Sequence, residues 1–185
     1  MKKITYTLKG SGGLIMHNVE SMLLERPRAT KHVDWESSSE VFEARMYLSN
    51  EEKIEIPPRV IKKMLSLAAQ KAWSVLGLKS GKSSYKQIIE SMVFLNDGGL
   101  LINKNKDDCI KHESFVVVSS SKVLRVRPMV ENWEGKLTLT VVNESQLPVA
   151  VLDEIITFGG AFLGLCDYRP EFGRFSVKKS SVQNV

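Results

Sequence analysis

The chain has 185 residues and a formal net charge of +5, because 26 lysines and arginines outnumber 21 aspartates and glutamates. Hydrophobic residues make up 43% of the sequence, which is typical of a globular protein and excludes a disordered chain. A chain of this length buries about 70% of its unfolded surface in a single core. We therefore expect one domain over residues 1–185.

The cysteines and the apolar segments limit where the protein works. Cys109 and Cys166 are the only cysteines and form no C-x-x-C pair, which fits a reducing compartment and argues against structural zinc. The first ten residues alternate apolar and polar side chains, unlike a signal peptide. The longest apolar segment, residues 155–166, has 12 residues, whereas roughly 20 are needed to cross a bilayer. The sequence thus predicts a cytoplasmic protein with no membrane partner.

The amino-terminal third predicts two strands separated by an irregular excursion. Apolar residues at positions 4, 6 and 8 alternate with polar ones, which predicts a half-buried strand over residues 2–9. The glycines at 10, 12 and 13 predict a turn after it. Residues 17–39 show little periodicity, and loops of that length in compact domains are uncommon and often functional. Residues 40–48 are expected to form another strand.

An amphipathic helix is predicted over residues 57–77. Pro57 and Pro58 suit a first helical turn, apolar residues recur with a 3.6-residue period, and Gly77 suits the end. Residues 78–84 are small, polar and basic, as in a flexible loop. The remaining elements expected are a hairpin-bearing insertion at 88–118, strands at 115–127, 136–142 and 174–177, and a second amphipathic helix at 148–162.

Without its insertions, the chain reads strand, helix, strand, strand, helix, strand. This order is that of the ferredoxin-like βαββαβ arrangement, an α+β fold with two helices on one face of a four-stranded antiparallel sheet. Insertions or extended loops are expected at residues 10–56 and 78–114. The same arrangement underlies the RNA-recognition module, which binds single strands on the open face, although a fold alone does not establish a function.

Two glycine-rich segments resemble nucleotide-binding loops but depart from their patterns. Residues 77–83 have three residues between the glycines where a triphosphate-binding loop has four, and they follow a helix. In residues 10–15, Ile15 occupies the third glycine position of a dinucleotide fingerprint. His17, His32 and His112 fall in no metal-binding motif. We therefore expect no cofactor, no metal and no catalytic residue, unless His17 serves a ribonuclease.

Positive charge is concentrated in the middle of the chain. Residues 57–89 hold seven lysines and arginines and no acid, whereas residues 34–55 hold seven acids. Guanidinium groups bind phosphates bidentately and lysines act as point charges, so this clustering favours a nucleic-acid ligand over a run of merely solvated lysines. The candidate phosphate-binding residues are Arg26, Arg28, Lys62, Lys63, Lys79, Lys82, Arg125, Arg127, Arg169 and Arg174.

Two tryptophans are candidate platforms for base stacking. Trp73 lies about 120° from Ile61 around the predicted helix, outside its apolar face. Trp133 lies in a polar turn. Exposed aromatic rings complete many single-strand binding sites. The alternative for each ring is a place at the edge of the core or in a protein interface.

The closing segment, residues 159–175, reads GGAFLGLCDYRPEFGRF. Together with residues 12–18 after the first strand, and with Arg125, Arg127, Pro128 and Trp133, it resembles the repeat-associated (RAMP) proteins of CRISPR systems, particularly the backbone subunits along guide RNA. The resemblance implies an RRM-like core, a single-strand groove, head-to-tail assembly and CRISPR-complex proteins as partners. Because the chain is short for such a subunit, it looks more like a stand-alone or phage-encoded relative.

Three functions remain open from the sequence. The preferred one is a non-enzymatic protein that binds single-stranded RNA or DNA and assembles into oligomers or filaments. The second is an inhibitor or mimic of a CRISPR effector complex, in which the acids of residues 34–55 contact a protein partner. The third is a metal-independent endoribonuclease with His17 as general base on a ribose 2′-hydroxyl.

Overall fold

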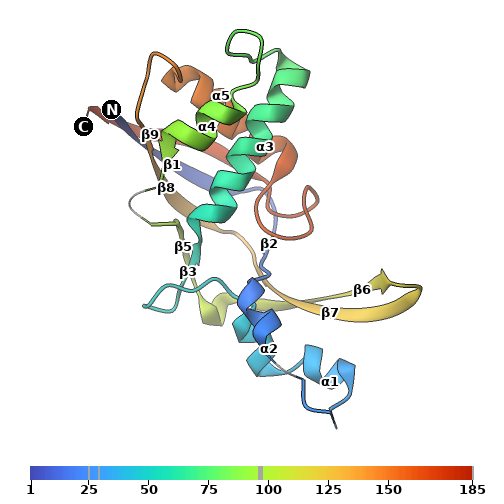
Figure 1. The fold of residues 1–185 in the computed structure, drawn as a ribbon. Coiled ribbons are helices and arrows are strands. Elements are labelled where there is room, and N and C mark those ends of the chain that lie inside the picture. The colour runs from blue at the N-terminus through green and yellow to red at the C-terminus, as the bar shows by residue number, and fades with distance from the viewer. Residues whose placement is uncertain (25, 29, 96–97, 185) are drawn as a thin grey trace.

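Strand β1 (Lys2–Gly10) follows the predicted alternation and lies within the main sheet. Ile4, Tyr6 and Leu8 are fully buried, and the threonines between them face the other side. The computed structural model describes every residue except 25, 29, 96, 97 and 185 (Figure 1). It confirms the expected α+β class, since helices accompany two antiparallel sheets.

The main sheet has six strands in the described part of the chain. Their order is β3-β5-β8-β1-β9, and β4 also pairs with β8. Thr5 of β1 lies between Thr138 of β8 and Ser181 of β9, and both pairs of strands are antiparallel, with a register shift after Thr5 in the β1–β9 pair. The other strands of this sheet are β3 (Lys53–Ile56), β4 (Val93–Phe94), β5 (Leu100–Asn105), β8 (Glu134–Val141) and β9 (Phe175–Asn184).

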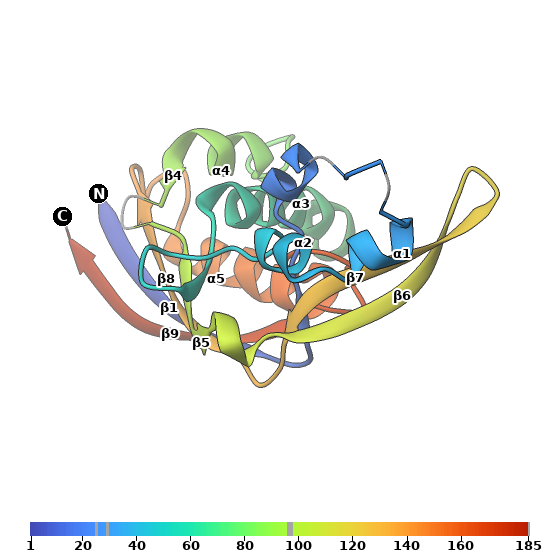
Figure 2. The same ribbon diagram turned by 90° about the horizontal axis from the view of Figure 1, so that it is seen from below.

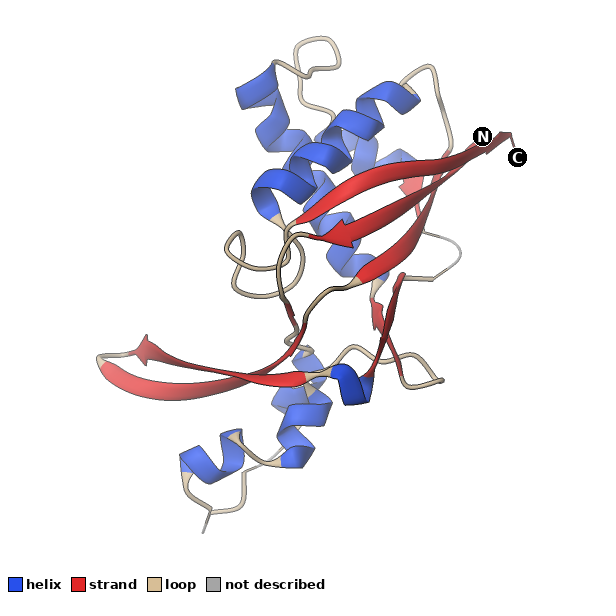
Figure 3. Ribbon diagram, turned by 180° about the vertical axis from the view of Figure 1, so that it is seen from behind, coloured by secondary structure: helices blue, strands red, loops and turns tan. Residues whose placement is uncertain are grey.

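Three helices cover one face of this sheet and leave the other uncovered (Figure 3). Helix α3 (Pro58–Leu76) confirms the predicted amphipathic helix, and Gly77 ends it with a φ of 71°. Helix α5 (Val149–Phe158) stops earlier than expected, because the chain continues into a π-helical turn, η3 (Gly159–Leu163). Helix α4 (Lys86–Met92) packs beside α3. No helix of the described residues is long and apolar enough to span a membrane.

A second sheet carries a hairpin that projects from the body (Figures 1 and 2). It is formed by β2 (Leu14–Ile15), β7 (Ser121–Val130) and β6 (Ile110–Val118), and a short helix η2 (Lys106–Asp108) precedes it. Ser119 and Ser120 have φ values of 47° and 70° and reverse the chain. The single strand predicted at 115–127 is therefore wrong, since the segment spans the tip of this hairpin.

A short helix, α2 (Ser39–Ala44), replaces the strand predicted over residues 40–48. Two more short helices, η1 (Val19–Leu23) and α1 (His32–Glu36), lie in the excursion before it. The Ser38 hydroxyl accepts a hydrogen bond from the Val41 N–H and caps α2, which starts a helix where alternation predicted a strand. Both α1 and α2 pack against β7.

Trp133 closes one end of the main core. Its ring is 1% exposed and meets the edge of Phe175, and its indole N–H donates to the Gly12 carbonyl at 3.0 Å. A Cβ at Gly10 would lie 2.3 Å from this indole nitrogen, so the glycine turn fits closely around the ring. Trp133 therefore presents no face to a base, contrary to the expectation of an exposed polar turn.

The glycine-rich closing segment forms a tight loop, residues 164–174. Gly173 has a φ of 74°, and a Cβ there would lie 2.0 Å from the Leu165 carbonyl oxygen. The Asp167 N–H donates to the Ile15 carbonyl and the Gly173 N–H to the Gly13 carbonyl, at 2.9 and 2.8 Å. The loop is thereby fixed beside β2.

We expect Trp133→Ala to lower the free energy of unfolding by about 3–5 kcal/mol, because it empties a large volume in a packed core. Trp73→Ala is the matched control, because that ring is 43% exposed and its removal opens no such cavity. Urea denaturation followed by circular dichroism measures both. Equal losses for the two variants would contradict the buried position of Trp133.

Candidate nucleic-acid interface

A groove lies along the exposed side of α3. It consists of three neighbouring hollows of about 560, 170 and 460 Å³. Lys63 lines the first two and Arg169 the last two, so the hollows are continuous. The cationic side chains among the described lining residues are Arg59, Lys62, Lys63, Lys71, Lys86 and Arg169.

Helical periodicity places the α3 cations on this side. Arg59 and Lys63 are four residues apart and share a face, while Ile61 and Leu65 point into the core. The other groove cations come from the α4 helix and from loop 164–174. Lys63, Lys71 and Arg169 form no hydrogen bond or ion pair within the described chain. These three positive charges are available to an anionic ligand.

Two carboxylates also line the groove, and both already have partners. Asp167 Oδ2 lies 3.3 Å from Arg127 Nε. Glu90 accepts a hydrogen bond from the Ser66 hydroxyl. Neither acid is paired with Lys63, Lys71 or Arg169. The groove therefore keeps an excess of positive charge.

Lys62 is held more firmly than its neighbours. Its ammonium group donates to the Val93 carbonyl and lies 5.2 Å from the centroid of the Phe94 ring. Partial burial lowers the pKa of Lys62, and the nearby Glu90 opposes that shift. Lys62 thus contributes charge at the groove edge while it ties α3 to β4.

His17 lies in the smallest hollow with Tyr47, Lys63, Asp167 and Arg169. Its Nδ1 is 3.8 Å from Asp167 Oδ2, and the Tyr47 hydroxyl donates to its carbonyl at 2.8 Å. Burial lowers the pKa of His17, and the Arg127 guanidinium lowers it further, against the opposing effect of Asp167. The imidazole is therefore neutral at neutral pH and can accept a proton or a hydrogen bond.

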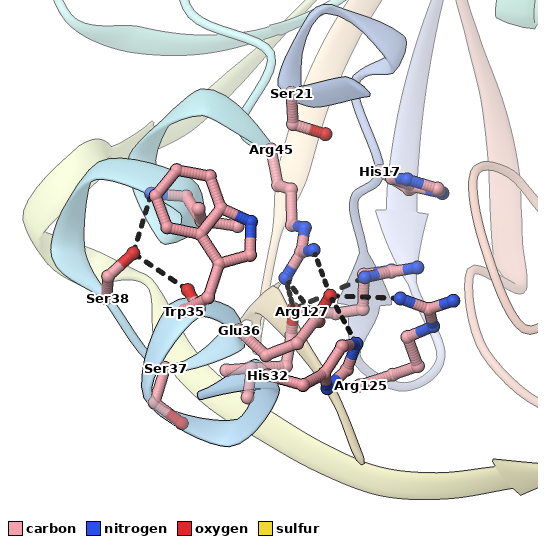
Figure 4. Close-up of polar contacts among 12 residues, drawn as sticks. His17, Ser21, His32, Trp35, Glu36, Ser37, Ser38, Arg45, Arg125 and Arg127 are labelled. Carbon is pink, nitrogen blue, oxygen red and sulfur yellow. Dashed lines mark hydrogen bonds and ion pairs between the residues drawn. The ribbon is translucent and has the colours of Figure 1, made fainter. Parts of the chain in front are cut away.

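Outside the groove lining, a buried ion cluster joins α1, the end of α2 and β7 (Figure 4). The Glu36 side chain is 4% exposed, and Arg45 contacts both of its oxygens, at 3.0 and 2.9 Å. Arg125 reaches the same carboxylate at 2.9 Å. Burial raises the pKa of Glu36, but the two guanidiniums outweigh it, so the net shift is downward. Arg125, which the sequence predicts to bind phosphate, instead forms this structural ion pair.

Cys166 lines two of the hollows with a protonated thiol. Burial raises the pKa of its thiol to about 12, and Arg169 lowers it only in part. A thiol with that pKa stays protonated at neutral pH. Within the described residues, no group of three or more histidine, cysteine or acidic side chains could hold a metal ion.

The structure brings together only part of the site predicted from sequence. Lys62, Lys63 and Arg169 line the groove, while Trp73 is exposed on α3 outside the groove lining. Arg127 is buried against Asp167, and the partly exposed Arg125 pairs with the buried Glu36. The predicted residues that are exposed but do not line the groove are Arg26, Arg28, Lys79, Lys82 and Arg174.

Sequence reasoning did not single out several residues of the groove. Arg59, Lys71 and Lys86 belong to the acid-free stretch, and the helical period already places Arg59 with Lys63. No local pattern identifies Tyr47, because it reaches the groove from the segment that follows α2.

Comparison with known proteins concerns the fold. No protein-family model and no curated protein matches the sequence. A solved structure of the type III-B CRISPR complex Cmr-beta bound to cognate target RNA contains a similar chain, with a TM-score of 0.51 and 11% identity over 98% of this chain and 60% of that chain. The structure of Csc2 of Thermofilum pendens has a TM-score of 0.39 and 11% identity, and the match covers 98% of this chain and 66% of that chain.

This similarity shows that the chain shares its fold with that chain of the Cmr-beta complex, which is compatible with the fold implied by the resemblance noted in the sequence. At 11% identity it concerns the fold alone. The chain spans about 60% of the length of the Cmr-beta chain that it matches.

We expect the stability of the protein to fall as the pH decreases below about 6.5. Because the folded state lowers the pKa of His17, the unfolded chain binds a proton more readily, and protonation favours unfolding. Urea denaturation at about pH 7.5 and about pH 5.5 should show a smaller loss for His17→Gln than for the unmodified protein. The same loss in both proteins would contradict this environment of His17.

Proposed function

We propose that this protein binds single-stranded nucleic acid in the groove along α3 without catalysing a reaction. The observation that carries the proposal is the excess of cationic side chains in one continuous groove, of which Lys63, Lys71 and Arg169 have no internal partner. Phosphates fit such a site because lysine supplies point charge and arginine a bidentate fork. Release of counterions from the strand would supply much of the affinity.

The proposal includes a ferredoxin-like, RRM-like core. The strand order β9-β1-β8-β5, with α3 between β1 and β5 along the chain and α5 between β8 and β9, is compatible with it. The solved chain of similar fold is described as part of a complex bound to cognate target RNA. As part of the proposal, this protein binds a guide or target strand, and its partners are proteins of a CRISPR complex.

Self-assembly along the strand is a further part of the proposal. The hairpin β6–β7 projects from the body and leaves Phe115 and Val117 exposed near its tip (Figure 2). Exposed apolar clusters commonly mark protein interfaces. A head-to-tail contact repeated between copies would form an open filament and extend the groove.

Mimicry of a CRISPR complex by the acidic segment receives less support. Glu36 is buried against Arg45, and Glu55 accepts a hydrogen bond from the Gly99 N–H. Glu51 and Glu52 pair with Lys53 and Lys106. Four of the seven acids of residues 34–55 therefore have partners inside the chain, although Glu51 and Glu52 stay exposed, as do Asp34, Glu40 and Glu43.

Replacing Lys63 and Arg169 together by alanine is expected to raise the Kd for a single-stranded oligonucleotide about tenfold or more, because two phosphate contacts are lost. The slope of log Kd against log salt should fall by about one for each contact removed. Fluorescence anisotropy across a salt series measures both quantities.

The matched control is Lys136→Ala with Lys178→Ala, which removes the same charge from the open face of the sheet. Both lysines are exposed and lie opposite Thr7, on the side away from the helices. The control should keep the affinity apart from a general charge effect. A greater loss in the control would place the strand on the sheet instead, and undetectable binding of the unmodified protein at low salt would reject the function.

Ribonuclease activity is the second candidate, favoured by the surroundings of His17. A neutral imidazole lies in one hollow with Lys63 and Arg169, which are suited to stabilise charge on a phosphate. As general base, His17 would take the proton of a ribose 2′-hydroxyl. The 2′-oxygen would attack the adjacent phosphorus, and the departing 5′-oxygen would take a proton from water, leaving a 2′,3′-cyclic phosphate.

If this activity exists, His17→Ala should abolish cleavage of an RNA oligonucleotide while its binding persists. A matched strand with a 2′-deoxyribose at the cut site should resist the unmodified protein. Gel electrophoresis of end-labelled strands without divalent metal provides the measurement. Cleavage that survives His17→Ala would exclude His17 as the base, and no cleavage would leave the non-catalytic proposal as the account of the groove.

A further inference from the structure

We infer that the groove contains a base-binding subsite at Phe162, where one nucleobase of a bound strand stacks on the aromatic ring. The inference rests on the proposed function and adds a residue that sequence reasoning did not identify. Phe162 lies on η3, between α5 and loop 164–174. Its side chain is 62% exposed, although the segment around it is apolar.

The Phe162 ring is held from behind by a second aromatic ring. The centroids of Phe162 and Phe158 are 4.9 Å apart, with an interplanar angle of 40°. Phe158 itself is buried, so it anchors the pair to the core. Gly160 lets the turn that carries Phe162 pack closely on β9, since a Cβ at Gly160 would lie 2.4 Å from the Phe175 carbonyl oxygen. The exposed ring is thus a supported platform.

Hollows flank this platform and continue the cationic groove. One, of about 460 Å³, includes Arg169 and Lys71, and the next, of about 440 Å³, includes Lys71, Gln70 and Ser74. Both lie in the range of about 300–1,000 Å³ typical of small-ligand pockets. Because Phe162 and Lys71 line both, the ring stands at the point where one hollow meets the next.

The charges beside the ring favour a nucleotide over an apolar peptide as the occupant. Lys71 and Arg169 have no internal ion-pair partner and flank the aromatic surface, so they complement a phosphate next to a stacked base. The surface is also continuous, through Leu67, with the hollow that Lys63 lines. Stacking on an aromatic ring tolerates every base, so this subsite would add affinity without sequence specificity.

The test compares Phe162→Ala with Phe162→Trp on two oligonucleotides of equal length, one with bases and one entirely abasic. Phe162→Ala should raise the Kd for the base-containing strand about 5- to 150-fold, and should leave the Kd for the abasic strand unchanged. Phe162→Trp should restore binding, because a larger ring still stacks. Leu101→Ala is the matched control, since it removes an exposed apolar side chain of β5 that does not line the groove.

Each other outcome overturns the inference. An equal loss on the abasic strand would mean that Phe162 acts only on the shape of the groove, and no loss on either strand would mean that no base stacks there. If Phe162→Ala changed the particle mass measured by light scattering without nucleic acid, the ring would belong to an interface between copies of the protein. Should the unmodified protein bind neither strand, the proposed function fails before the subsite is reached.

Discussion

The buried Glu36 carboxylate is the constraint on which the arrangement of the groove depends. It lies between the guanidiniums of Arg45 and Arg125, which come from α2 and β7. Without it, two buried or half-buried positive charges would face each other, and breaking such a pair typically costs about 3–5 kcal/mol. The Arg45 guanidinium also donates to the Val126 carbonyl at 2.7 Å. The cluster therefore fastens the helical insertion to the hairpin, while Arg127 and Asp167 connect that hairpin to loop 164–174.

Pairing separates the cations of this protein into two sets. Those in the interior, Arg45, Arg125 and Arg127, are matched by Glu36 and Asp167 and hold elements together. Those along the groove, such as Lys63 and Arg169, have no carboxylate partner and face solvent. A charge that is neither buried nor paired contributes little to stability. The concentration of such unpaired charges in one groove is therefore better explained by a ligand than by a contribution to stability.

Sequence periodicity was sufficient to predict β1 and α3, because each buries one regular face and so leaves a regular pattern of apolar residues in the sequence. It failed at residues 40–48, where the Ser38 cap starts a helix, and at Ser119 and Ser120, whose left-handed backbone carries no strong sequence signal. For the site, α3 could be predicted because its charges repeat with the helix. The pairing of Arg125 with Glu36, the burial of Trp133 and the exposure of Phe162 depend on contacts between segments far apart in the chain.

The most direct measurement of the central claim is photo-cross-linking of a single-stranded oligonucleotide that carries photoreactive bases, followed by mass spectrometry of the linked peptides. The account predicts cross-links in α3 (Pro58–Leu76) and in residues 159–174, lost at high salt. Cross-links confined to the open face of β1, β8 and β9, or to the tip of the β6–β7 hairpin, would contradict it.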